Sequence, residues 1–313
     1  MKILFMGTPD FAVGSFLALC REFSVVGVIT QPDKPKGRGY TLTPPPVKLE
    51  AEKLGIPVYQ PETLRDGAIK ELLDELAPDL IAVVAYGKIL PSYVLDYPKY
   101  GCINLHGSLL PKYRGAAPMQ RAIIDGEKVT GVTTMYMEQG LDTGDMLEKV
   151  TVEIGENDNF EDIHDRLASL GAELLVSTVK GLEKGEIVPE KQDDALSTYA
   201  AKIEKSDCVL DFSRSAGELH DLIRGLSPIP LAFAYLNGKM LKIKSSEIIE
   251  REGVCGKAGE VVSADSRGIT VACQKGKLLI TALVPEGKKA MSAAAFVNGR
   301  GVAIGDILTS SKE

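Results

Sequence analysis

The stretch GCINLHGSLLPKYRG, residues 101–115, decides the fold and the candidate site. An apolar lead-in precedes Asn104 and His106, and Gly107-Ser108 follows, which predicts a buried strand that ends in a loop. Residues two apart on a strand point to the same face, so we expect Asn104 and His106 to lie side by side. Ligands of open parallel sheets bind beyond the carboxyl ends of the strands. The stretch therefore predicts a site that holds an amide donor and a group titrating near neutral pH.

A second loop bounded by glycines, GLDTGD at residues 140–145, carries Asp142. Its carboxylate would orient His106 if the fold brings the two together. Taken singly, a His satisfied by local hydrogen bonds and an Asp in a turn are the more common interpretations. The combination with Asn104 favours a site.

Outward from this stretch, short apolar runs alternate with helical patterns. Strands are expected at residues 2–6, 24–30, 80–85, 102–106, 130–137 and 146–154, and helices at 11–22, 47–54, 68–76, 116–125 and 159–183. This alternation predicts a parallel α/β sheet of Rossmann-like type. The turn after the first strand has only Gly7 in place of G-x-G-x-x-G, which disfavours a nicotinamide dehydrogenase.

Residues 31–46 are predicted to be a long loop with five prolines, and Lys34, Lys36 and Arg38 lie close together in it. A loop of this length in a compact domain is usually functional or disordered. The two interpretations are a solvated insertion and a clamp on RNA phosphates. The residues alone favour the insertion.

The pattern changes to period two in the last third of the chain. After a helix at residues 213–226, two apolar runs flank Asn237-Gly238, which is a strong hairpin signal, and further short strands follow. These strands predict a small β-barrel. We expect a catalytic domain over residues 1–184, a polar linker over 185–207 and the barrel domain over 208–313.

Composition limits the class of protein. The net charge of −7 argues against indiscriminate nucleic-acid binding, but residues 210–313 carry 14 Lys and Arg against 11 Asp and Glu, which permits an RNA contact there. Five scattered cysteines without a C-x-x-C pair disfavour zinc and a disulfide framework, so we expect a reducing cytoplasm. The N-terminus resembles a first strand more than a signal peptide, and no run reaches the ~18 apolar residues of a membrane span.

Asn104-x-His106, the SLLPKYRG block at residues 108–115 and Asp142 resemble the folate-dependent formyltransferases. Flanking blocks at residues 31–39, 85–91, 114–118, 140–145 and 287–291 narrow the resemblance to the methionyl-tRNA formyltransferase family. The resemblance implies a Rossmann-like catalytic domain followed by an OB-like barrel. It also implies transfer of a formyl group from 10-formyltetrahydrofolate to the amino group of methionyl-initiator tRNA.

Residue roles follow from the same resemblance. It implies catalysis by Asn104, His106 and Asp142, folate binding by the loop of Ser108, Leu109, Leu110 and Pro111, and tRNA contact by Lys34, Lys36 and Arg38. The barrel lysines 239, 242, 244, 288 and 289 are further candidates for phosphate contact, although each taken singly is more often solvated. Arg114 either holds its loop or meets an anionic ligand. We expect a monomer.

Formyl transfer to an amine needs an oxyanion donor and a route for protons, which Asn104 supplies together with His106 and Asp142. A neutral amine is already a nucleophile, so no Ser, Cys or metal is required. Two alternatives share part of the pattern. A UDP-amino-sugar N-formyltransferase would use the same folate donor, and a non-catalytic RNA-binding module would explain the basic loop and barrel but not the three site residues.

Overall fold

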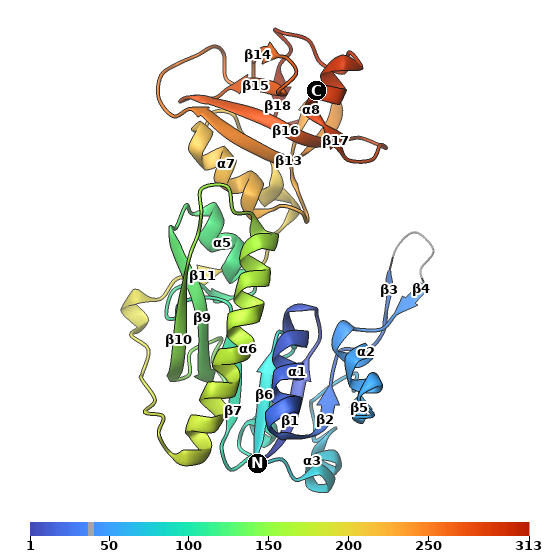
Figure 1. The fold of residues 1–313 in the computed structure, drawn as a ribbon, viewed down its shortest axis with the longest axis vertical. Helices are drawn as coiled ribbons and strands as arrows, with labels where there is room; N and C mark the ends of the chain where they lie inside the picture. The colour runs from blue at the N-terminus through green and yellow to red at the C-terminus, as the bar shows by residue number, and fades with distance from the viewer. Residues whose placement is uncertain (37–40, 313) are drawn as a thin grey trace. The chain divides into compact units, whose positions relative to one another are not determined.

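The computed structural model describes residues 1–36 and 41–312 (Figure 1). Residue contacts divide the chain into two compact units, the first made of Met1–Gly115, Thr130–Val152 and His164–Tyr199. The second comprises Ala116–Val129, Glu153–Ile163 and Ala200–Glu313. Each unit has its own seven-stranded sheet. The domain boundaries expected from the sequence stay a prediction.

The first unit is organised around a sheet with the strand order β10-β9-β7-β6-β1-β2-β5. Its strands are β1 (Lys2–Gly7), β2 (Ser24–Ile29), β5 (Val58–Tyr59), β6 (Leu80–Val84), β7 (Cys102–His106), β9 (Val129–Tyr136) and β10 (Met146–Glu153). The pairs from β7 through β6, β1 and β2 to β5 are parallel, as predicted. β9 runs antiparallel to β7, a departure from the all-parallel expectation. All five residues of β6 are buried, as expected of a strand covered on both faces.

The helices of the first unit begin and end near the predicted positions. They are α1 (Phe11–Glu22), α2 (Pro46–Lys53), α3 (Lys70–Leu76), the short α4 (Ser92–Leu95), which the sequence pattern did not reveal, and α6 (Phe160–Lys184), whose first turn belongs to the second unit. Asp10 caps α1 by accepting a hydrogen bond from the Phe11 N–H at 3.0 Å. α6 packs closely on the site strand, because a Cβ at Gly171 would lie 2.7 Å from Leu105 Cδ2.

The prediction of a structureless loop over residues 31–46 is wrong. Lys34–Lys36 (β3) and Thr41–Thr43 (β4) form an antiparallel ribbon, and Pro35 pairs with Leu42. The ribbon projects away from the sheet in Figure 1. A two-stranded ribbon tolerates Pro because each strand has an edge that needs no N–H donor.

The second unit is a curled antiparallel sheet packed against helices, which agrees with the predicted small barrel. Its strands are β12 (Ala232–Leu236), β13 (Lys239–Glu250), β14 (Val261–Ala264), β15 (Ile269–Ala272), β16 (Lys277–Pro285), β17 (Met291–Ser292) and β18 (Leu308–Thr309), and its helices are α5 (Pro118–Ile124), α7 (Ala216–Gly225) and α8 (Ala293–Asn298). Asn237 and Gly238 have φ of +50° and +70°, as the predicted tight hairpin turn requires. Three register shifts between β13 and β16 bend the long strands.

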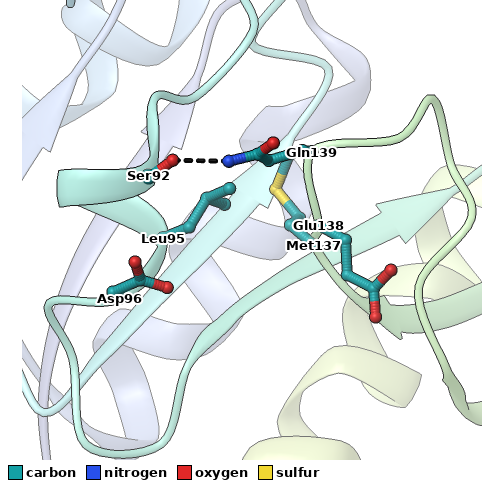
Figure 2. A pocket seen from close by; sticks show the side chains of 6 residues that line it. All are labelled: Ser92, Leu95, Asp96, Met137, Glu138 and Gln139. Atoms are coloured by element: carbon teal, nitrogen blue, oxygen red, sulfur yellow. Dashed lines mark hydrogen bonds between the residues drawn. The ribbon is translucent and has the colours of Figure 1, made fainter.

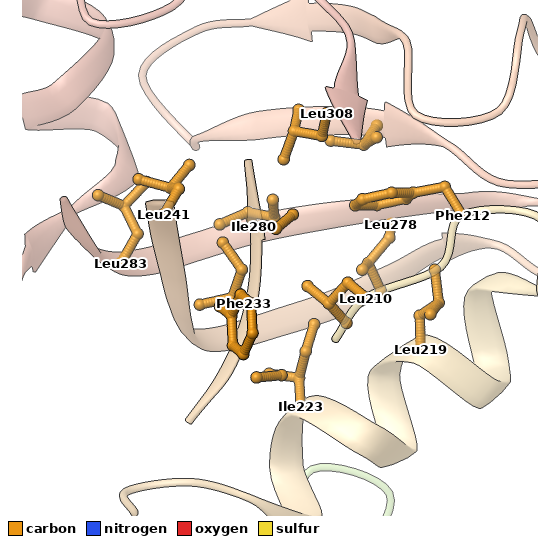
Figure 3. Packing of buried hydrophobic residues seen from close by; sticks show 14 of the residues in the cluster. Leu210, Phe212, Leu219, Ile223, Phe233, Leu241, Leu278, Ile280, Leu283 and Leu308 are labelled. Atoms are coloured by element: carbon orange, nitrogen blue, oxygen red, sulfur yellow. The ribbon is translucent and has the colours of Figure 1, made fainter. Parts of the chain in front are cut away.

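One hydrophobic core joins α7 to the curled sheet. Leu219 and Ile223 of α7 face Leu210, Phe233, Leu278 and Ile280 (Figure 3). Ser215 and Glu218 form a capping box that fixes the start of α7. The apolar side of this helix therefore forms part of the core.

His220 lies on α7 and is buried, with 2% of its surface exposed. Its ring nitrogens lie 3.0 Å from Ser246 Oγ and 3.0 Å from the Glu156 carbonyl oxygen. Burial lowers the pKa of His220, and the positive charge of nearby Arg224 lowers it further. The Glu156 carbonyl and the Asp221 carboxylate act in the opposite direction and only partly offset this shift. The residue is structural.

Acidification is expected to destabilise the protein through His220. Below the ordinary pKa of 6.5, the unfolded chain takes up a proton that the buried imidazole resists. Stability should therefore fall, by up to ~1.4 kcal/mol per pH unit, from pH 6.5 down to the lowered pKa, and this contribution is absent above pH 6.5. Urea unfolding of the wild type and of His220→Gln at several pH values measures it. Parallel pH dependences for the two proteins would contradict the assignment.

No helix among residues 1–36 and 41–312 is both long and apolar enough to cross a membrane.

Candidate active site

Asn104 and His106 lie on β7 at the carboxyl end of the parallel sheet. His106 pairs with Thr133 and Asn104 with Met135 on β9, so both side chains point to one face. Asn104 is half-buried, and its carboxamide has no hydrogen-bond partner in the described part of the chain. It is therefore available to a ligand.

The His106 ring is held by the backbone of the following loop. Its Nε2 lies 2.9 Å from the carbonyl oxygen of Tyr113, and 5% of the residue is exposed. Because a carbonyl oxygen only accepts, Nε2 must carry a proton and donate. In the neutral imidazole, Nδ1 is then the unprotonated nitrogen.

Asp142 faces this nitrogen from the neighbouring loop. Its Oδ2 lies 3.7 Å from His106 Nδ1, which is beyond hydrogen-bond range but within ion-pair range for a protonated ring. The same oxygen accepts a hydrogen bond of 2.8 Å from the Gly115 N–H. Asp142 has a φ of +53°, a left-handed conformation that Asp adopts more readily than most residues. The structure thus brings Asp142 to His106, as the sequence led us to expect.

The loop of Ser108, Leu109, Leu110 and Pro111 is anchored to β9. Thr133 Oγ1 donates to the Ser108 carbonyl at 2.7 Å and accepts from the Leu110 N–H at 3.2 Å. Ser108 and Leu110 are buried, and the Ser108 hydroxyl donates to the Lys112 carbonyl at 2.7 Å. A Cβ at Gly131 would lie 2.5 Å from Leu109 Cδ2, so Leu109 packs directly on the β9 backbone. The loop is therefore fixed beside the strand before any ligand binds.

Arg114 holds its loop, which is the first of the two roles considered for it. Its Nε donates to Gln192 Oε1 at 2.9 Å and its Nη2 to Asp194 Oδ1 at 2.8 Å. The side chain is 11% exposed. Both partners lie in the polar segment that follows α6.

Sequence reasoning missed that this polar segment contacts the site loops. Thr198 Oγ1 accepts from the Tyr113 N–H at 2.8 Å, and the Thr198 carbonyl accepts from the Arg114 N–H at 2.9 Å. Gln192 is buried and donates to the carbonyls of Asp142 at 2.8 Å and Gly144 at 2.7 Å. No periodicity marks these residues, since a single buried Gln or Thr in a polar stretch carries no sequence signal.

The basic ribbon is fixed at its base by a polar network. Lys48 Nζ lies 3.0 Å from both carboxylate oxygens of Asp33, and Gln60 Nε2 donates to the same carboxylate at 2.7 Å. The hydrogen bonds from Gln60 and Lys48 lower the pKa of Asp33. Lys34, the next residue, is exposed. Lys36 ends β3, and Arg38 lies outside the described residues.

A hollow of about 250 Å³ lies elsewhere in the first unit (Figure 2). It is lined by Ser92, Leu95, Asp96, Met137, Glu138 and Gln139, and Gln139 Nε2 donates to Ser92 Oγ at 2.6 Å. Asn104, His106 and Asp142 are not among the residues that line this hollow. Within residues 1–36 and 41–312, no group of three or more His, Cys, Asp and Glu side chains is placed to hold a metal ion.

Comparison with protein families gives the class of the chain. Residues 1–179 match the formyl transferase family and residues 202–301 match the formyl transferase C-terminal domain. The fold agrees with solved structures. WlaRD, a sugar 3N-formyl transferase, has a TM-score of 0.65 at 19% identity over 92% of this chain and 99% of its own. HypX from Aquifex aeolicus has a TM-score of 0.63 at 18% identity over 96% of this chain and 47% of its own. The chain is a formyltransferase.

Full-length relatives narrow the class. The methionyl-tRNA formyltransferase of Geotalea daltonii is 50% identical and covers 97% of both chains. That of Bacillus subtilis is 49% identical over 100% of this chain and 99% of its own. The chain belongs to the methionyl-tRNA formyltransferase family.

Proposed function

We propose that the protein transfers the formyl group of 10-formyltetrahydrofolate to the free amino group of methionyl-initiator tRNA. The observation that carries this proposal is the meeting of a free carboxamide, a backbone-anchored imidazole and a carboxylate at one edge of a formyltransferase sheet. These are the groups that acyl transfer between nitrogens requires. The family membership of the chain selects the acceptor.

The three side chains divide the chemistry between them. As the amine attacks the formyl carbon, negative charge develops on the formyl oxygen, and the Asn104 amide donates a hydrogen bond to it. The His106 ring, with Nε2 committed to the Tyr113 carbonyl, uses Nδ1 to exchange protons on the reacting side. Asp142 stabilises the protonated ring across the 3.7 Å gap and so makes that proton transfer easier. The folate nitrogen leaves with a proton as the amide forms.

The anchored loop supplies the binding surface for the folate. Leu109 and Pro111 remain partly exposed, while the buried Ser108 and Leu110 hold the loop in shape. A prearranged apolar wall lowers the entropy lost when a flat pterin binds. Folate binding by these four residues, without a metal, is part of the proposal.

The basic ribbon and the second unit supply the contacts to tRNA in this proposal. Lys34 lies near Lys88, and burial together with repulsion from Lys34 lowers the pKa of Lys88, against the opposing effect of Glu62. Neighbouring cations attract phosphate. Lys34, Lys36 and Arg38 would contact the acceptor end of the tRNA. Free cysteines throughout the chain fit a reducing cytoplasm, and we propose that the enzyme acts there as a monomer.

Lys34→Ala is expected to raise KM for the tRNA several-fold and to leave KM for the folate unchanged, since a lost phosphate contact weakens only the nucleic acid. The dependence of log(kcat/KM) on log salt should become shallower by about one unit. Steady-state kinetics at several salt concentrations measures both effects. Lys184→Ala, which removes an exposed lysine at the end of α6 in the first unit, is the control. Equal losses for both substrates would contradict the ribbon's role.

Acceptor choice tests the proposed function directly. The purified protein is incubated with 10-formyltetrahydrofolate and either methionyl-initiator tRNA, methionyl-elongator tRNA or a UDP-amino sugar, and tetrahydrofolate release is followed. We expect release that depends on the initiator tRNA. Release with the sugar alone would retain the site chemistry and overturn the acceptor, and release with none of the three would overturn the proposed function.

A further inference from the structure

We propose that Gln192 is a positioning residue of the active site, which sets Asp142 against His106. The inference rests on the proposed function, because it assigns Gln192 a role in formyl transfer through Asp142. Gln192 lies eight residues beyond α6, in the polar segment at the end of the first compact unit. Nothing in its sequence context distinguishes it from a solvated linker residue.

Every polar group of the Gln192 side chain is committed to the site loops. Its Nε2 donates to the Asp142 carbonyl at 2.8 Å and to the Gly144 carbonyl at 2.7 Å, and its Oε1 accepts from Arg114 Nε at 2.9 Å. The side chain therefore uses both donors and its acceptor. At 6% exposure these bonds are sheltered from water, so their loss would leave buried carbonyls without a partner.

The bonds join two loops that carry different parts of the site. Residues 140–145 present the Asp142 carboxylate, and residues 113–115 present both the carbonyl that anchors His106 and the N–H that binds Asp142 Oδ2. Gln192 ties the first loop to Arg114 of the second. The distance between His106 Nδ1 and Asp142 Oδ2 depends on how these loops sit together, and Gln192 is a direct side-chain link between them.

The remaining supports of Asp142 do not replace this link. The Gly115 N–H holds the carboxylate but not the backbone that carries it. Asp142 has a left-handed φ, which costs free energy and persists only when the surroundings enforce it. The two hydrogen bonds from Gln192 hold the carbonyls of residues 142 and 144, and so act on the backbone that carries the carboxylate.

The effect of removing Gln192 should appear in kcat. Gln192→Ala is expected to lower kcat about 10- to 100-fold, because a displacement of order 1 Å in a reacting group has a cost of this size. KM for the folate and for the tRNA should change less than threefold, since the hydrogen bonds of the Gln192 side chain go to Arg114, Asp142 and Gly144 and to neither the 108–111 loop nor the described residues of the basic ribbon. Rates are measured per molecule of folded enzyme, in single turnovers with enzyme in excess.

Gln192→Glu separates the hydrogen bond that Gln192 accepts from Arg114 from the two that it donates to backbone carbonyls. The carboxylate keeps the acceptor for Arg114 but loses both donors to the carbonyls of Asp142 and Gly144. We expect kcat to fall at least as far as in Gln192→Ala. Wild-type kcat in Gln192→Glu would show that only the Arg114 link matters and would overturn the proposal.

A double-mutant cycle decides whether Gln192 acts through Asp142. In an Asp142→Asn background, Gln192→Ala should cost less than about threefold, since the group that it positions is already gone. If the loss of kcat in the double variant equals the product of the losses in the two single variants, the proposal is overturned. Thr178→Val is the matched control, because Thr178 is buried in the same unit and hydrogen-bonded to Leu174, Glu148 and Thr134, with no hydrogen bond to residues 113–115 or 140–145. It should lower Tm without changing kcat.

The outcomes distinguish the two proposals. Wild-type protein that fails to formylate methionyl-initiator tRNA contradicts the proposed function. Normal wild-type transfer, with a Gln192→Ala variant that loses Tm but keeps kcat, contradicts only the role of Gln192 and makes it a structural residue like Thr178.

Discussion

His106→Ala should lower kcat by about 10²–10⁴-fold, the range of a general acid–base group, while folate binding persists. The ring is the only basic side chain on β7, and it faces Asp142 with one nitrogen while the other is hydrogen-bonded to Tyr113. Removing it deprives both the attacking and the leaving nitrogen of a proton carrier. Single-turnover transfer to methionyl-initiator tRNA measures the loss.

The same variant should also be less stable. It leaves the Tyr113 carbonyl without the imidazole donor in a buried setting, which costs about 1–3 kcal/mol. Circular dichroism and folate titration therefore accompany the kinetics, so that unfolding is not mistaken for lost chemistry. His164→Ala is a control, because His164 pairs with Asp165 and Asp10 on α6 and α1, away from β7. A fully active His106→Ala would contradict the mechanism.

The long strands and the helices of the first unit were the part of the fold that the sequence predicted best. β7 occupies the predicted residues 102–106, because an uninterrupted apolar lead-in and a Gly-Ser exit define both ends of a buried strand. The tight turn at Asn237-Gly238 was equally clear, since few residue pairs adopt two consecutive positive φ angles. Local chemistry dictates such elements.

The basic ribbon was missed for a physical reason. Pro35 and the prolines at 44–46 suggest a loop, and the strands on either side of residues 37–40 are only three residues long. The ribbon's position depends on the Asp33, Lys48 and Gln60 network, whose members come from three separate segments. Such contacts between segments distant in sequence leave no local pattern.

The sequence pointed to the candidate residues on the strand, but it did not reveal the residues that hold the site loops in place. Asn104 and His106 follow from strand geometry, and Asp142 from its loop at the same sheet. Gln192 and Thr198 lie 50 or more residues beyond Asp142 in a stretch without period, so their burial against the site loops depends on the folded structure. A residue that supports a site through hydrogen bonds to backbone groups is defined by its place in the fold more than by its residue type.

Asn104→Ala is expected to lower kcat by about 10²–10³-fold, the usual cost of one lost oxyanion donor. Asn104 is well suited to that role, because no residue that the structure describes hydrogen-bonds its half-buried carboxamide, which therefore needs no rearrangement to meet the reacting oxygen. KM for both substrates should change little, since the hydrogen bond strengthens only as charge develops. Stability should be nearly unaffected, because no internal hydrogen bond is broken.

Asn104→Asp sharpens this test. The two side chains have nearly the same shape, but a carboxylate accepts hydrogen bonds and repels the developing oxyanion. We therefore expect Asn104→Asp to be at least as slow as Asn104→Ala, although it fills the site better. Since His106 acts on the nitrogens and Asn104 on the oxygen of one transition state, the Asn104→Ala, His106→Ala double variant should fall short of the product of the single losses. An Asn104→Asp enzyme close to wild-type rate would show that the carboxamide donates no hydrogen bond in the transition state.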